Sequence, residues 1–196
     1  MSQELFDWAW LVLLLVIIAV RKMHERKAAR RTSLKETPFA EAALMVLWGV
    51  AAGVVPLFYL FGPWLDFATL PVTMAPAFGF AGIALFVMAI WLLHRAHTDL
   101  GKGWSPRVEP EAEQRLVTEG VYKRIRHPMY AAHVLWGLAQ ALLLPNLVAG
   151  PVALVLIVAV LGLRIPREEQ AMLSQFGEAY RRYMSTTGRI VPKLSA

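Results

Sequence analysis

The chain has 196 residues, of which 57% are hydrophobic, and its 20 Lys and Arg exceed its 14 Asp and Glu. The apolar residues come in long runs rather than periodic stripes, which favours one helical membrane domain, residues 1–196, over soluble domains. Because the chain has no cysteine, disulfides, thiolate metal sites, Cys nucleophiles and lipidation of its own thiols are excluded. The net charge of +6 comes with no recognition motif, so we expect no nucleic-acid binding.

Five apolar segments predict an all-α integral membrane fold with five transmembrane helices. They are residues 5–20, 42–61, 74–93, 129–144 and 147–163. The second and third have the ~20 residues that a ~30 Å hydrocarbon core requires. The first is shorter, and its Trp8 and Trp10 are expected at a membrane interface. The last two are separated by Pro145 and Asn146, which predicts a tight helical hairpin whose turn reaches the far interface.

Basic residues predict the orientation of these helices. All 20 Lys and Arg lie within residues 21–35, 95–126 and 164–193, whereas residues 62–73 contain none. The positive-inside rule therefore predicts an outside N-terminus, a cytoplasmic C-terminus and two cytoplasmic loops. Residues 2–7 are acidic, unlike a cleavable signal peptide, so we expect the first segment to stay as an anchor. The compact chain suggests a bacterial inner membrane, with its functional face toward the cytoplasm.

Two further patterns predict helix packing. An amphipathic helix over residues 168–184 is predicted to lie at the cytoplasmic interface, because its apolar residues recur at helical spacing: Met172, Leu173, Phe176, Tyr180 and Tyr183. Gly49 and Gly53 form a Gly-x-x-x-Gly pair in the second segment. We expect this pair to pack against another helix of the same chain, although a partner chain stays possible and the oligomeric state is open.

Polar residues are concentrated before the fourth segment, in Gly120-Val-Tyr-Lys-Arg-Ile-Arg-His-Pro-Met-Tyr130. A residue before proline avoids helical backbone, and proline favours the first helical position. The helix is therefore predicted to begin at Pro128, with His127 facing its unpaired amides. Both interfacial anchoring and a binding site are compatible with the Arg and Tyr residues of this block.

A carboxylate pair, Glu168-Glu169, follows the fifth segment on the same side of the membrane. The pair either favours the N-terminus of the amphipathic helix through its dipole or binds a ligand that carries hydroxyls or positive charge. In the second case Arg164 and Arg167 supply counter-charge. The Gly101-Lys-Gly103 sequence is either a helix C-cap with a turn or part of a ligand loop.

Histidines raise the question of a metal centre. His94 and His97 share one helical face, and His127 and His133 supply two more imidazoles. There is no His-Glu-x-x-His motif and no dense histidine box, so we predict no metal site. His24 is expected to be a solvated loop residue.

Several of these motifs, in this order and spacing, resemble the isoprenylcysteine carboxyl methyltransferase family. They are residues 116–130, the hairpin turn at Asn146, Arg164 through Glu169, and Phe176-Gly-Glu-Ala-Tyr180. The related phospholipid N-methyltransferases share the overall pattern. The resemblance covers roughly residues 100–192; residues 1–95 match only in kind, as three N-terminal transmembrane helices. It implies that residues 96–196 bind S-adenosylmethionine in a cytoplasm-facing pocket formed by the hairpin, the loop before it and the C-terminal helix.

The resemblance also implies roles for individual residues. The positions that would line the cofactor site are Gly101, Gly103, Tyr122, Arg126, His127, Pro128, Tyr130, Glu168 and Glu169. Catalytic roles would fall to His127, Arg164 and Arg167. A carboxylate acceptor needs only an Arg to orient it, whereas an amine acceptor needs a base, for which His127 or Glu168 is the candidate.

The predicted function is methyl transfer from S-adenosylmethionine to a lipophilic small molecule or lipid, either an isoprenylcysteine-type carboxylate or a lipid amine. The acceptor is expected to enter sideways from the membrane lipids, between the apolar helices. One alternative is a membrane oxidoreductase, of the NADPH-dependent reductase type or the His/metal type. Another is a non-catalytic membrane scaffold, against which the intact Arg126, His127, Tyr130 and Glu168-Glu169 argue.

Overall fold

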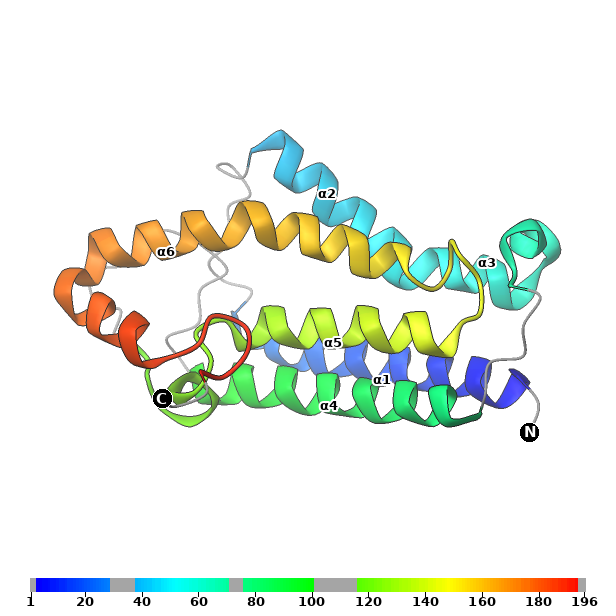
Figure 1. Cartoon of the computed structure of the whole chain (residues 1–196), viewed down its shortest axis with the longest axis horizontal. Helices are drawn as coiled ribbons and strands as arrows, with labels where there is room; N and C mark the ends of the chain where they lie inside the picture. Colours follow the sequence, from blue (N-terminus) through cyan, green and yellow to red (C-terminus); the bar gives the residue numbers. More distant parts are fainter. Residues whose placement is uncertain (1–2, 29–37, 71–75, 101–115, 194–196) are drawn as a thin grey trace.

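The computed structural model describes residues 3–28, 38–70, 76–100 and 116–193, and these form an all-α bundle. The α-helices are α1 (Gln3–Ala28), α2 (Phe39–Gly49), α3 (Val55–Phe61), α4 (Pro76–Leu100), α5 (Pro128–Leu143) and α6 (Val152–Thr186). A π-helical turn, η1 (Val50–Val54), joins α2 to α3, and two short 3₁₀ helices are η2 (Pro63–Ala68) and η4 (Gly120–Lys123). In Figure 1, α1, α4 and α5 run side by side, while α6 lies along α2 and η1.

Three of the apolar helical stretches are long enough to cross a membrane: Gln3–His24, Phe39–Phe61 and Pro76–Leu100. The prediction of an all-α membrane protein is therefore confirmed. The core between the helices is closely packed, and its buried members include Ile17, Phe86 and Leu143. Trp8 is exposed, as expected for an interface, whereas Trp10 is fully buried among the helices.

The second apolar stretch contains a π-helical turn because Pro56 has no N–H. With i to i+5 pairing, the carbonyl of Ala51 faces Pro56 and receives no proton from it. The fully buried amide of Gln140, on α5, donates to this carbonyl at 3.0 Å and also donates to the carbonyl of Ala149. A polar side chain inside the bundle thus satisfies backbone groups that lipid cannot.

The turn between α5 and α6 closes the predicted hairpin, and Asn146 organises it. Its side chain is buried and donates to the carbonyl of Leu65 at 2.8 Å. The side-chain oxygen Oδ1 of Asn146 accepts hydrogen bonds from the backbone amides of Val148 and Ala149. Backbone hydrogen bonds also join this turn to the end of η2. Protein groups therefore satisfy these polar atoms of the turn at the far end of the bundle.

The predicted separate amphipathic helix is wrong in one respect, because residues 168–184 continue the fifth apolar segment within α6. The helix runs through Pro166 and changes direction only at Gly177, whose φ of 50° and ψ of −122° are not helical. Figure 1 shows the last part of α6 folded back toward the start of α5. Glu168 and Glu169 lie midway along α6, so the alternative of a helix N-terminus beneath them is excluded.

Two smaller expectations are also corrected. A Cβ added at Gly49 or Gly53 would meet no described atom within 4 Å, so this pair does not pack against another of the described helices. His24 is not a loop residue but lies near the end of α1. Its ring centroid is 5.3 Å from that of His94 and 4.8 Å from that of His97.

Candidate functional site

The site is built where the last residues of the described chain return to the start of α5. The amide of Arg126 donates to the carbonyl of Gly188 at 2.8 Å, and that of His127 donates to the carbonyl of Arg189 at 2.9 Å. The amide of Gly188 donates in return to the carbonyl of Arg124. These bonds hold the residues after α6 beside the residues before α5, a closure that follows from the change of direction at Gly177.

A buried ion pair lies beneath this closure. The Nη2 and Nε atoms of Arg126 donate to Oε1 of Glu169 at 2.9 and 3.1 Å. The two side chains are only 8% and 5% exposed. Nη1 of Arg126 donates to the carbonyls of Met184 and Thr187. One guanidinium therefore ties the middle of α6 to its end, and both ionised groups are well paired, as buried charges need to be.

Two more donors converge on Glu169. Arg189 donates to both carboxylate oxygens, with its Nε 3.2 Å from Oε1, and Nε2 of His127 lies 3.4 Å from Oε1. Burial alone would raise the pKa of Glu169, but the hydrogen bonds from His127, Arg189 and Arg126 outweigh it and lower the pKa to about 2. Glu169 is thus an ionised carboxylate on which the side chains of Arg126, His127 and Arg189 converge.

Glu168 has different surroundings and is 22% exposed. The hydroxyl of Tyr130 donates to its Oε1, and Nε of Arg164 donates to the same oxygen at 3.3 Å. Nδ1 of His127 lies 3.6 Å from its other oxygen. The imidazole therefore lies between the two carboxylates and stacks on the ring of Tyr130, with 5.6 Å between ring centroids. The helix begins at Pro128 as predicted, but His127 makes no side-chain cap, so that expectation is wrong.

Sequence reasoning missed two members of this cluster, Glu41 and Arg189. Glu41, in the first turn of α2, is buried and pairs with both predicted arginines. Its Oε1 is 3.4 Å from Nε of Arg164, and its Oε2 accepts a hydrogen bond from Arg167. A lone acidic residue at the edge of an apolar segment is itself a signal, because ionisable groups there need partners. Those partners lie more than a hundred residues away in sequence, so no local pattern identifies them.

The remaining predicted site residues lie apart from the carboxylates or outside the described residues. The hydroxyl of Tyr122 donates to the carbonyl of Ala96, and its carbonyl accepts from the hydroxyl of Tyr183, so Tyr122 joins α4 to the end of α6. Pro128 is buried at the first position of α5. Gly101 and Gly103 fall outside the described residues.

Within the parts of the chain that the structure describes, no group of three or more His, Asp or Glu side chains has the arrangement of a metal site. His24, His94 and His97 pack ring against ring instead. The ring centroid of His133 lies 4.9 Å from that of Trp48, and Nδ1 of His133 lies 2.6 Å from the carbonyl oxygen of Met129.

Fold and site together define a helical membrane protein with a buried ionic site at one end of its bundle. Residues 82–174 match the isoprenylcysteine carboxyl methyltransferase (ICMT) family. The resemblance seen in the sequence is thereby confirmed.

The chain is also similar to curated proteins and to a solved structure. Protein-S-isoprenylcysteine O-methyltransferase B of Arabidopsis thaliana is 27% identical over 113 residues, which are 57% of each chain. Protein-S-isoprenylcysteine O-methyltransferase of Schizosaccharomyces pombe is 32% identical over 77 residues, 39% of this chain and 33% of the relative. The structure of a eukaryotic intramembrane Ras methyltransferase, ICMT, superposes with a TM-score of 0.59 at 20% identity, covering 94% of this chain and 67% of that one. The last comparison establishes a shared fold.

The low pKa of Glu169 predicts how stability depends on acid. Its folded pKa of about 2 lies below the ordinary 4.5, so its contribution is complete above pH 4.5 and is lost as the pH falls toward 2. The stability difference between wild type and Glu169→Gln should therefore be constant, on the order of a few kcal/mol, from pH 7 to 5. It should shrink below pH 4.5. Thermal unfolding in detergent at each pH measures it, and a difference that does not change between pH 5 and 3 would contradict the ion-pair assignment.

Proposed function

We propose that this chain is an integral membrane methyltransferase that transfers a methyl group from S-adenosylmethionine to the carboxylate of a lipophilic acceptor. The observation that carries the proposal is the clustering of Arg126, His127, Tyr130 and the Glu168-Glu169 pair at one end of the bundle. All five lie within the family-matched residues 82–174. Among acceptors, the guanidiniums of Arg164 and Arg167 favour a carboxylate over an amine.

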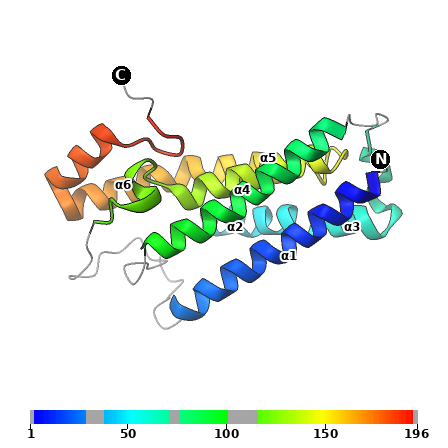
Figure 2. The same ribbon diagram turned by 90° about the horizontal axis from the view of Figure 1, so that it is seen from below.

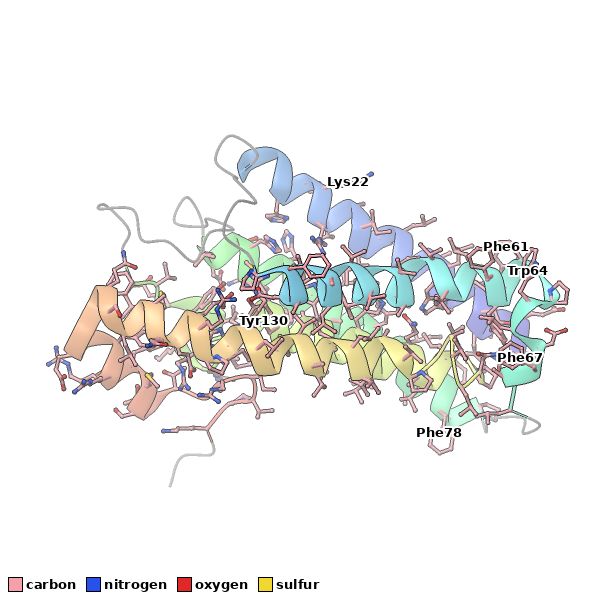
Figure 3. The ribbon with its side chains drawn as sticks, turned by 90° about the horizontal axis from the view of Figure 1, so that it is seen from above. Lys22, Phe61, Trp64, Phe67, Phe78 and Tyr130 are labelled. Atoms are coloured by element: carbon pink, nitrogen blue, oxygen red, sulfur yellow. The ribbon has the colours of Figure 1, made fainter. Side chains whose placement is uncertain are left out.

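We place this end of the bundle at the cytoplasmic face, with five membrane-crossing helices and the N-terminus outside. Figure 3 shows Phe61, Trp64 and Phe67 together at the opposite end, and all three are exposed, as expected for a membrane interface. Figure 2 shows α1 and α4 running from that end toward the site, and both helices finish among basic residues, including Lys22 and Arg95. The bacterial inner membrane expected from the sequence stays a prediction.

The side chains of the site match the chemistry of the proposed methyl donor. S-adenosylmethionine carries an amino-acid carboxylate and ammonium, ribose hydroxyls and a positively charged sulfur that activates the methyl group. Glu168 is partly exposed and would accept from the ammonium or the hydroxyls, and Arg189, 52% exposed, would bind the carboxylate. Glu169 is almost enclosed by its donors, so we propose that it holds Arg126 and His127 in place rather than lining the pocket.

The reaction requires alignment rather than a strong base. An ionised acceptor oxygen attacks the methyl carbon, a C–O bond forms as the C–S bond breaks, and the products are a methyl ester and a neutral thioether. No proton moves, so His127 is not needed as a base for a carboxylate acceptor. Arg164, held by Glu168, would orient the acceptor carboxylate. Such positioning contributes on the order of 7–11 kcal/mol to lowering a barrier.

A partly open cavity between α1, α2 and α5 supplies space for the apolar part of the acceptor. It measures about 270 Å³ and is lined by Leu14, Ile18, Arg21, Lys22, Trp48, Gly49, Gly53 and Trp136. Glu41, Met45 and Trp48 follow one another at i, i+4 and i+7 on one face of α2. The ion pairs and the cavity therefore lie about 10 Å apart along the same helical face. We propose that a prenyl chain occupies the cavity while its carboxylate reaches Arg164.

Methyl transfer itself tests the proposal. Purified protein in detergent should transfer methyl groups from S-adenosylmethionine to an S-prenylcysteine and produce a base-labile methyl ester. Glu168→Gln, which removes the carboxylate charge near the donor site, should lower kcat/KM by about tenfold or more. Glu178→Gln is the matched control, because Glu178 is an exposed residue on the same helix. Methylation of a lipid amine with no activity on the carboxylate would contradict the acceptor assignment.

Filling the cavity tests the site of the prenyl chain. Gly53→Leu places a side chain in its open space, so KM for a long prenyl acceptor should rise by roughly tenfold while kcat changes little. Gly162→Leu is the control, since Gly162 also faces open space but lies on α6, away from the cavity. Equal KM values for the two variants would show that the prenyl chain does not bind in this cavity.

A further inference from the structure

Glu41 is the acidic residue of the site whose position needs most explanation. It comes from α2, outside the family-matched residues 82–174, yet it is buried against the guanidiniums of the hairpin. Arg164 lies between two carboxylates, 3.4 Å from Glu41 and 3.3 Å from Glu168. Arg167 completes the pair of cations around Glu41. The structure thus contains a carboxylate seat, formed by Arg164 and Arg167, with a carboxylate of the chain already in it.

The surroundings of this carboxylate seat are apolar and partly open. The guanidinium of Arg164 lies 5.9 Å from the ring centroid of Tyr130, and its Nη1 lies 2.9 Å from the sulfur of Met45. The side chain of Arg167 is about half exposed. Figure 3 shows Tyr130 between α2 and α6, the two helices that supply the seat. Two cations beside a ring and a thioether suit a carboxylate attached to an apolar group.

We propose that Glu41 occupies the place of the acceptor carboxylate and leaves it when the acceptor binds. The inference rests on the proposed function and adds an internal competitor to it. Arg164 is largely buried, and a buried guanidinium is costly without counter-charge, so Glu41 compensates Arg164 in the free protein and also pairs with the half-exposed Arg167. The exchange replaces one carboxylate by another, which leaves the charge of the seat unchanged. Because Glu41 is in the first turn of α2, rotation of its side chain would keep its charge near the helix N-terminus, where the helix dipole favours a carboxylate.

The Glu41→Gln variant tests this exchange, because glutamine keeps the shape of the side chain but removes the competing charge. We expect the Kd of an S-prenylcysteine to fall by roughly three- to tenfold, in line with the loss of one competing charge-assisted contact. The Kd of the methyl ester of the same prenylcysteine, which has no carboxylate, should not change. Glu41→Asp keeps the charge but shortens its reach, so it should give a smaller decrease and also serves if Glu41→Gln does not fold.

Three comparisons make the outcome decisive. S-adenosylhomocysteine should bind both variants as it binds wild type, because its proposed contacts do not include Glu41, and Glu178→Gln should leave all affinities unchanged. An anchoring role for Glu41 predicts the opposite result, with weaker prenylcysteine binding or a lower kcat at unchanged Kd, and either would overturn the exchange. A wild type that binds S-adenosylhomocysteine but no prenylcysteine would instead overturn the proposed acceptor.

Discussion

The buried pair of Arg126 and Glu169 is the interaction on which the rest of the site depends. Neither charge would be tolerated alone where it lies, and each is satisfied only when three parts of the chain meet. Those parts are the residues before α5, the middle of α6 and the segment that follows α6. By joining these three parts, the pair fixes how they lie relative to one another at the site.

At both ends of the hairpin, buried polar groups need partners, and the two ends provide them in different ways. At the far end, Asn146 satisfies the turn with neutral hydrogen bonds, and one residue suffices because the chain only reverses direction there. At the near end the charged groups come from α2, from the residues before α5 and from α6, and some of their surface stays exposed. The neutral hydrogen bonds at the far end stabilise the turn. The partly exposed charged groups at the near end can exchange their partners for a charged ligand. This contrast is the physical argument for placing function at the near end.

Much of the fold could be predicted from sequence because it follows from apolar runs, proline and glycine. The start of α5 at Pro128 and the hairpin turn at Asn146 are examples. The continuity of α6 through Pro166 could not be predicted, because tertiary packing maintains a helix that proline alone would weaken. The open face of Gly49 likewise depends on where α1 lies, which no pattern within α2 specifies.

The site shows the same division. Glu168, Glu169 and Arg126 were recognisable because their motifs are compact in sequence, and their proximity in the structure fits the predicted cluster. Glu41 and Arg189 were missed because their roles arise only from packing between distant segments. The different surroundings of the two adjacent carboxylates could not be predicted from the sequence either, because they depend on how many donors reach each of them. Glu169 is more deeply buried and has more donors than Glu168, and this difference is the basis for the separate roles that we propose for them.

The central claim, that the ionic cluster binds the methyl donor, is tested most directly by titrating S-adenosylhomocysteine into purified protein by calorimetry. Wild type and Glu178→Gln should bind with equal affinity, while Glu168→Gln should bind at least about tenfold more weakly because it loses the reachable carboxylate charge. Equal binding by all three proteins would remove Glu168 from the donor site. No binding by well-folded wild type would contradict the methyltransferase assignment itself.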